Sequence, residues 1–132
     1  MSEDQYVSIF QLIGAKKGVR ALVDRFYDEM EIQPQSKQIL AMHPRELSDS
    51  REKLYLFLCG WFGGPSLYVE KYGHPRLRAR HLPFQIDSSA RDAWMNCMAV
   101  ALQEQFPDEE VRQQIFAAFY RLANHTRNIP DS

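Results

Sequence analysis

Apolar side chains recur at steps of three and four positions along most of this chain. One such series comprises Val19, Leu22, Val23, Phe26, Tyr27 and Met30. This spacing places the side chains along one face of an α-helix, whereas a half-buried strand alternates apolar and polar residues at every second position. Strong alternation of that kind is absent from the sequence. The pattern therefore predicts an all-α fold.

The start and the end of a second helix are both predicted by local signals. The segment Asp49-Ser-Arg-Glu52 has the reciprocal spacing of a capping box, in which two side chains satisfy backbone N–H groups at a helix start. The apolar face that follows comprises Leu54, Phe57, Leu58, Trp61 and Phe62. The helix should end at Gly63-Gly64-Pro65, because glycine relaxes the backbone and proline cannot continue the helical hydrogen bonds.

Similar signals predict the boundaries of the other helices. The helix with the stripe from Val19 is expected to begin after Gly18. A later helix should be capped by Ser88 or Ser89 and end before Pro107, and another should begin near Asp108. The first dozen residues are expected to form a short additional helix, with Tyr6, Phe10 and Ile13 as its apolar positions.

Size and composition narrow the class of protein. A chain of 132 residues is expected to form one domain, over residues 1–132, and its net charge of -1 argues against nucleic acid as a partner. No apolar run approaches the roughly 20 residues of a membrane span, and the acidic start of the chain lacks the apolar core of a signal peptide. We therefore expect a cytoplasmic protein without a membrane partner. Cys59 and Cys97 lie in apolar surroundings and are interpreted as buried packing residues.

The segment Pro65–Pro83 differs from the rest of the chain because it is polar and proline-rich. A connection this long in a small domain is usually functional or disordered, and its scattered apolar residues argue against disorder. Near the end of this segment lies His81, and three arginines precede it at alternate positions. Imidazole binds metals through one ring nitrogen, and arginine pairs with anionic groups, so the combination suggests an anionic metal cofactor. A partly exposed histidine in a basic loop is the alternative that spacing leaves open.

Other metal sites and nucleophilic catalysis are poorly supported. The four histidines show no HxxxH spacing and the cysteines form no CxxC pair, as a zinc site would favour. No serine or cysteine lies in a recognisable nucleophile motif, and Gly63-Gly64-Pro65 ends a helix instead of opening one around a phosphate.

Several further side chains have chemistry that a cofactor pocket would use. Tyr27 and Trp94 lie on apolar helix faces and carry a polar group that needs a partner when it is buried, although core aromatics show the same pattern. His43 precedes Pro44, which favours a turn at the surface. One side of the second helix combines Ser50, Lys53, Leu54 and Phe57. The lysine of this set would extend to the edge of the apolar stripe, where an anion could meet it.

These residues, taken together, resemble the second group of bacterial truncated haemoglobins. The matching strings are Phe26-Tyr27, Phe57-Leu58, Trp61-Phe-Gly-Gly-Pro65, Tyr68, Gly73-His-Pro-Arg-Leu-Arg-Ala-Arg-His81, Pro83-Phe84, Ala90-Arg-Asp-Ala-Trp94 and Cys97-Met98. The resemblance extends from about Phe10 to Tyr120, which is nearly the whole chain.

The resemblance implies a shortened globin fold, in which two helices cross two others around a b-type haem. It assigns His81 as the iron ligand and places Arg80 and Lys53 at the haem propionates. The implied distal residues are Tyr27, His43, Trp94, Ser50 and Leu54. The implied porphyrin walls are Phe57, Phe84 and Met98. The chain departs from the family at His43, where tyrosine or phenylalanine is frequent, and at Ser50, where many globins have a distal histidine.

The function that the resemblance implies is binding of dioxygen and other diatomic ligands. An enzyme that uses the same haem, as a nitric oxide dioxygenase or peroxidase with an external reductase, is the main alternative, and a haem-free helical interaction domain is the third. Tyr27 or His43 is also a candidate sixth ligand of ferric iron. We expect a monomer or a weak homodimer.

Overall fold

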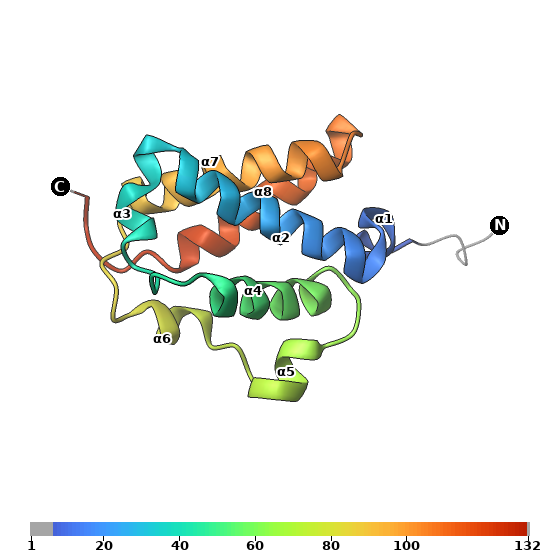
Figure 1. The fold of residues 1–132 in the computed structure, drawn as a ribbon, viewed down its shortest axis with the longest axis horizontal. Helices are drawn as coiled ribbons and strands as arrows, with labels where there is room; N and C mark the ends of the chain where they lie inside the picture. Colours follow the sequence, from blue (N-terminus) through green and yellow to red (C-terminus); the bar gives the residue numbers. More distant parts are fainter. Residues whose placement is uncertain (1–6, 132) are drawn as a thin grey trace.

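All regular structure in the computed structural model, which describes residues 7–131, is helical (Figure 1). The elements are α1 (Ile9–Ile13), α2 (Ala15–Ile32), η2 (Pro34–Ser36), α3 (Lys37–Leu40), α4 (Ser48–Trp61), α5 (Leu67–Tyr72), α6 (Leu77–His81), α7 (Ser88–Gln105) and α8 (Glu109–His125). This confirms the all-α prediction. Among residues 7–131, no helix combines the length and the apolar character that crossing a bilayer requires.

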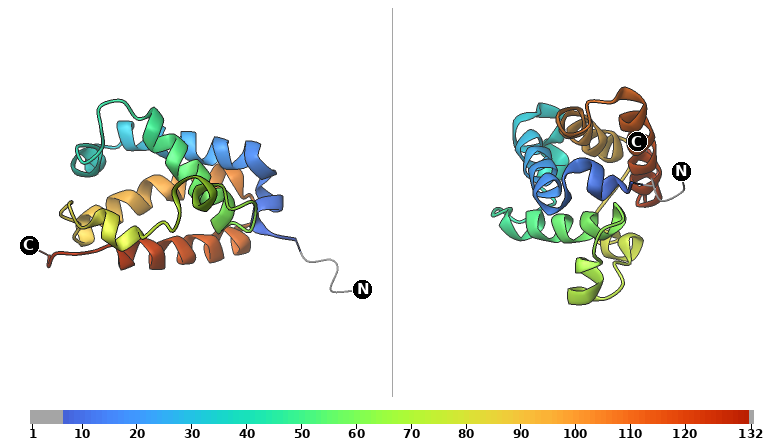
Figure 2. Two further views of the ribbon diagram at one scale, coloured as in Figure 1. Left: turned by 90° about the horizontal axis from the view of Figure 1, so that it is seen from below. Right: turned by 90° about the vertical axis from the view of Figure 1, so that its right-hand side faces the viewer.

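The four long helices form two packed pairs. Helix α2 packs against α4 and also against α7, which in turn packs against α8 (Figures 1 and 2). The centre of this arrangement contains fully buried side chains from all four helices, among them Leu22, Phe26, Leu58, Met98, Leu102 and Phe119. Burying a large apolar side chain contributes roughly 1.5–3 kcal/mol, so these faces supply the driving force that joins the two pairs. Two helices thus cross two others, as the family resemblance implied.

Helix α2 begins earlier than predicted, because Gly18 lies inside it and not before it. The turn into the helix is made by Gly14, which has the left-handed φ of 100° that glycine adopts without strain. Gly18 has a packing role instead. A Cβ atom at Gly18 would lie 1.8 Å from the carbonyl oxygen of Ile13 at the end of α1, so only glycine allows the two helices to approach this closely.

Substituting Gly18 with alanine is therefore expected to destabilise the protein, although alanine favours helices. The clash is with backbone, which cannot rotate away, and overpacking of this kind costs about 2 kcal/mol of unfolding free energy. Urea denaturation of Gly18→Ala measures the loss. Lys17→Ala, an exposed substitution in the same turn, is the control and should change stability by less than about 0.5 kcal/mol. Equal stability of the two variants would contradict this packing role.

Two of the predicted helix caps are wrong. Helix α4 begins at Ser48, after Leu47, and no side chain caps it, so the capping box at Asp49–Glu52 does not form. The Glu52 carboxylate instead accepts from Arg20 of α2 at 2.7 Å. Helix α7 is capped by Asp87, whose carboxylate accepts from the backbone N–H of Ala90, and not by either of the serines that follow it.

The remaining boundary predictions are confirmed. Helix α4 ends before Gly63-Gly64-Pro65, and Asp108 caps α8 through the N–H of Val111. The short first helix is α1, although Tyr6 lies outside the described residues. Both cysteines are free and buried. The polar segment Pro65–Pro83 folds into two short helices, α5 and α6, which lie outside the two long pairs (Figure 1).

Candidate functional site

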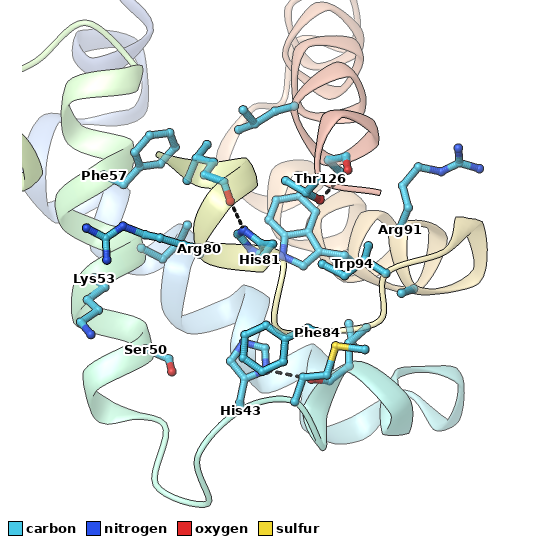
Figure 3. Close-up of a pocket in the computed structure, with 18 of the residues that line it drawn as sticks. His43, Ser50, Lys53, Phe57, Arg80, His81, Phe84, Arg91, Trp94 and Thr126 are labelled. Carbon is cyan, nitrogen blue, oxygen red and sulfur yellow. Dashed lines mark hydrogen bonds between the residues drawn. The ribbon is translucent and has the colours of Figure 1, made fainter. Parts of the chain in front are cut away.

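A cavity of about 390 Å³ lies between the helix pairs and is closed on one side by α6. Its volume is within the range of small-molecule sites, and most of its surface is apolar. All but one of the predicted site residues line it, from several elements: Tyr27, His43, Ser50, Lys53, Leu54, Phe57, Arg80, His81, Phe84 and Trp94 (Figure 3). The exception is Met98, which is fully buried in the core and does not line the cavity.

The imidazole of His81 is oriented by the backbone of its own helix. Its Nδ1 atom lies 2.6 Å from the carbonyl oxygen of Leu77 (Figure 3). A carbonyl only accepts hydrogen bonds, so Nδ1 carries a proton, and in the neutral imidazole Nε2 is the nitrogen with the lone pair. This is the tautomer that binds a metal through Nε2, with the other ring nitrogen held by a backbone acceptor.

A second imidazole, that of His43, lines the same cavity in the same tautomer. Its Nδ1 atom lies 2.8 Å from the carbonyl oxygen of Ile39, so its Nε2 atom is also a free acceptor. The ring meets the Tyr27 ring edge-on, with 5.7 Å between the two centroids. His43 is thus partly buried against the cavity, contrary to the surface position that its place before Pro44 favours.

The hydroxyl of Tyr27 keeps its proton in this environment. The side chain is buried on α2, and burial raises the pKa of the phenol, an effect that the positive charge of Arg51 only partly opposes. Its one hydrogen bond within the described residues is a long one, 3.5 Å to the carbonyl oxygen of Ser50. The phenol is therefore a hydrogen-bond donor with little competition from the protein.

Trp94 contributes a second polar group to the cavity, from α7. Its ring packs between Phe26 and Phe119, with centroid separations of 4.9 Å and 5.8 Å. Among residues 7–131, no acceptor forms a hydrogen bond with its indole N–H. Figure 3 shows the indole among the side chains that line the cavity. A half-buried indole with an unused donor is suited to binding a small polar ligand.

Positive charge gathers at the rim of the cavity. Lys53 on α4 pairs with Asp49 at 3.2 Å, and both side chains are largely exposed. The Arg80 side chain donates from Nε to the carbonyl oxygen of Pro75, and no carboxylate of residues 7–131 lies within ion-pair distance of it. Its two terminal nitrogens are thus available to an anion. Exposed pairs such as that of Lys53 are weak and exchange readily for a better partner.

Sequence reasoning missed part of the cavity wall. The additional lining residues include Ile86, Ala90, Arg91, Phe119, Leu122, Ala123 and Thr126, mostly from α7 and α8. The helical period identified the apolar faces of these helices, but a face that borders a cavity and a face that packs in the core have the same period. Only the tertiary structure separates the two.

The residues present fit a flat, apolar, anionic metal cofactor. Within the described part of the chain, no three His, Cys, Asp or Glu side chains come together to hold a bare metal ion. A cofactor that brings its own metal ligands needs only one more from the protein, a role that the oriented imidazole of His81 fits, while the apolar walls and the rim cations match a macrocycle with acidic substituents. Haem has this chemistry.

Comparisons with known proteins point the same way. The sequence profile of the family described as "Bacterial-like globin" matches residues 8–128. The chain is 40% identical over 107 residues to the group 2 truncated hemoglobin YjbI of Bacillus subtilis (strain 168), covering 81% of this chain and 79% of that protein. Among solved structures, it is similar to the group II 2-on-2 hemoglobin of Agrobacterium tumefaciens (39% identity, TM-score 0.91, 98% of this chain and 100% of that one). It is also similar to a truncated oxygen-avid haemoglobin from Bacillus subtilis (36% identity, TM-score 0.82, 92% and 100%).

Proposed function

Because this chain belongs to the bacterial-like globin family, as a group 2 truncated haemoglobin, we propose that it binds dioxygen and other diatomic ligands on a b-type haem that His81 holds. The observation that carries the proposal is the pairing of one pre-oriented imidazole with two hydrogen-bond donors in a single apolar cavity. A relative of known structure is described as oxygen-avid, which supports the choice of ligand.

The Nε2 atom of His81 would bind the cofactor, and the cationic and aromatic side chains around the cavity would orient the cofactor. When bound, the haem would supply an iron atom that can bind a small diatomic ligand. Arg80 and Lys53 would pair with the propionates, and Phe57 and Phe84 would pack on the ring faces. Arginine binds a carboxylate through two parallel hydrogen bonds, so Arg80 would also fix the rotation of the ring.

The distal residues would control how long a ligand stays. Tyr27 and Trp94 donate hydrogen bonds, and a donor stabilises a diatomic ligand that carries partial negative charge. His43 donates from Nδ1 to Ile39, so its Nε2 atom in the neutral imidazole would accept the Tyr27 hydroxyl proton and compete with the ligand for it. The raised pKa of Tyr27 disfavours a phenolate, which leaves His43 as the better candidate for a sixth ligand of ferric iron.

A haem titration of the purified protein tests the proposal. A Soret band that saturates at one haem per chain, followed by carbon monoxide binding to the ferrous form, is the expected result. No Soret band after haem addition would instead favour the haem-free interaction domain.

Trp94→Phe is expected to speed dioxygen dissociation about tenfold. The substitution keeps an aromatic ring between Phe26 and Phe119 but removes the N–H, and a hydrogen bond of about 1.4 kcal/mol corresponds to a factor of ten. Stopped-flow displacement of dioxygen by carbon monoxide measures the rate. Trp61→Phe, which changes an indole outside this cavity, is the control. A dissociation rate equal to that of the control would contradict the donor role.

The two hydrogen-bond donors, Tyr27 and Trp94, also suit the enzymatic alternative, in which the same haem acts as a peroxidase or a nitric oxide dioxygenase. Donors that stabilise bound dioxygen also polarise the O–O bond of a peroxide. A nitric oxide dioxygenase would in addition use the bound dioxygen to oxidise nitric oxide. Such turnover would need an external reductase. Mixing the dioxygen-loaded protein with nitric oxide in a stopped-flow instrument, and then following its reduction, distinguishes catalysis from reversible binding.

A further inference from the structure

The helix that carries His81 has little structure of its own to hold it. Helix α6 has five residues, follows Arg76 with its left-handed φ of 49°, has no side-chain cap and buries none of its residues. Helices this short are unstable in water without tertiary contacts. The position of His81 therefore depends on contacts that other segments make with α6 and the loop after it.

Those contacts come from the C-terminal tail, defined here as residues 125–131. The left view of Figure 2 shows the end of α8 beside α6. The Arg78 side chain donates from Nη1 to the backbone carbonyls of His125 (2.9 Å) and Arg127 (3.0 Å). These carbonyls lie at and just after the end of α8, where no helical N–H is available to them. One end of the tail is thus joined to α6.

Asn128 makes the more extensive connection. Its Nδ2 atom donates to the carbonyls of His81 (3.0 Å) and Phe84 (2.9 Å). Its Oδ1 atom accepts from the backbone N–H of Ile86 (2.9 Å), and its own N–H donates to the Ile86 carbonyl (2.9 Å). Three of the four hydrogen bonds that an asparagine amide can make are therefore directed at the loop from His81 to Ile86.

A neighbouring residue of the tail makes contacts of similar strength to a different place. Asp131 accepts from the N–H of Ser88 and from its hydroxyl, both at 3.0 Å. These bonds join the tail to the start of α7 and do not involve α6 or the His81 carbonyl. Asp131 is therefore a matched control for Asn128.

We propose that Asn128 is a positioning residue for the iron ligand. Its bonds to the His81 and Phe84 carbonyls fix the end of α6, and thereby the direction from which the imidazole approaches the cofactor. We call these two hydrogen bonds, together with that from the Ile86 N–H to Asn128, the clamp. The effect of the clamp on iron rests on the proposed function, whereas the clamp itself is a property of the polypeptide.

The clamp is tested by hydrogen exchange on the full chain as purified, in the variants Asn128→Ala, Asn128→Asp and Asp131→Ala. Exchange of the amides in residues 77–86 should be about tenfold faster in Asn128→Ala, because three hydrogen bonds are lost. Asn128→Asp keeps an acceptor for the Ile86 N–H but places a second carboxylate oxygen against the carbonyls of His81 and Phe84, so its exchange should be at least as fast as that of Asn128→Ala. Asp131→Ala should leave these amides unchanged. Equal exchange in Asn128→Ala and the wild type, or equal acceleration in Asp131→Ala, would overturn the proposal.

The consequence for iron is tested on the haem-loaded variants. Asn128→Ala should shift or broaden the iron–histidine stretching band of the ferrous protein and lose haem to excess apomyoglobin about tenfold faster, while Asp131→Ala matches the wild type. Faster amide exchange with an unchanged band would show that Asn128 does not act on His81 and would also overturn the proposal. A wild-type chain that binds no haem would refute the proposed function alone, since the exchange experiment still decides whether the clamp exists.

Discussion

Replacing His81 with alanine is expected to weaken haem binding on the order of 100-fold or more. His81 is the cavity imidazole on α6, and its Nε2 lone pair is available because Nδ1 donates to Leu77. Loss of a partner that only orients a metal ligand already costs about 10–100-fold in affinity, so loss of the ligand itself should cost at least as much. The apolar walls remain in the variant and retain some affinity. Haem titration followed at the Soret band measures the change.

His43→Ala is the matched control for this experiment, because His43 has the same tautomer and lines the same cavity. It should alter ligand kinetics but leave haem affinity within a few-fold of the wild type. Free imidazole added to His81→Ala should restore a six-coordinate or ligand-bound spectrum. If His43→Ala loses haem and His81→Ala keeps it, the assignment of the iron ligand is reversed.

Replacing Tyr27 with phenylalanine is expected to speed dioxygen dissociation by about 10- to 100-fold. Hydrogen bonds to a charged partner contribute about 1.5–3 kcal/mol, and each 1.4 kcal/mol is a factor of ten. The hydroxyl is protonated, and its hydrogen bond to the Ser50 carbonyl is long, 3.5 Å. Exchanging that weak bond for one to the ligand therefore costs little. The phenylalanine ring fills the same space. Displacement of dioxygen by carbon monoxide, followed by stopped-flow absorbance, gives the rate.

Tyr55→Phe provides the control for Tyr27→Phe. Tyr55 is also buried between α2 and α4, but its ring lies under the guanidinium of Arg20, 3.9 Å from ring centroid to Cζ, and it does not line the cavity. Its dissociation rate should equal that of the wild type. An unchanged rate in Tyr27→Phe would exclude the hydroxyl as the donor and leave Trp94 as the remaining candidate.

The helices were largely predictable because helical structure depends on local geometry. A period of three to four residues specifies the buried face of a helix, and Gly63-Gly64-Pro65 ends α4 whatever surrounds it. The caps were less predictable. Glu52 had the right spacing to cap α4, but its carboxylate pairs instead with the guanidinium of Arg20, which only the packing of α2 brings within 2.7 Å.

The residues of the candidate site were predictable mainly from the resemblance to a family. Periodicity alone left Tyr27 and Trp94 as ordinary core aromatics and favoured the surface for His43. Met98 shows the limit of transferring residues one by one, since it lies in the core beyond the cavity wall. The period of α7 is the same for both kinds of position, so the sequence could not separate them.

The sequence by itself determined the all-α architecture and the order of its long helices, and its family resemblance identified most of the side chains that line the cavity. The tertiary structure decided how those side chains are held. It gave the Nδ1 atoms of His81 and His43 backbone acceptors, left the Trp94 N–H without an acceptor among residues 7–131, and placed Asn128 on the His81 carbonyl across 47 positions of sequence. The physical reason is the range of each interaction. A helical period is set by residues three and four apart, whereas a hydrogen bond between the tail and α6 exists only after the two helix pairs have packed.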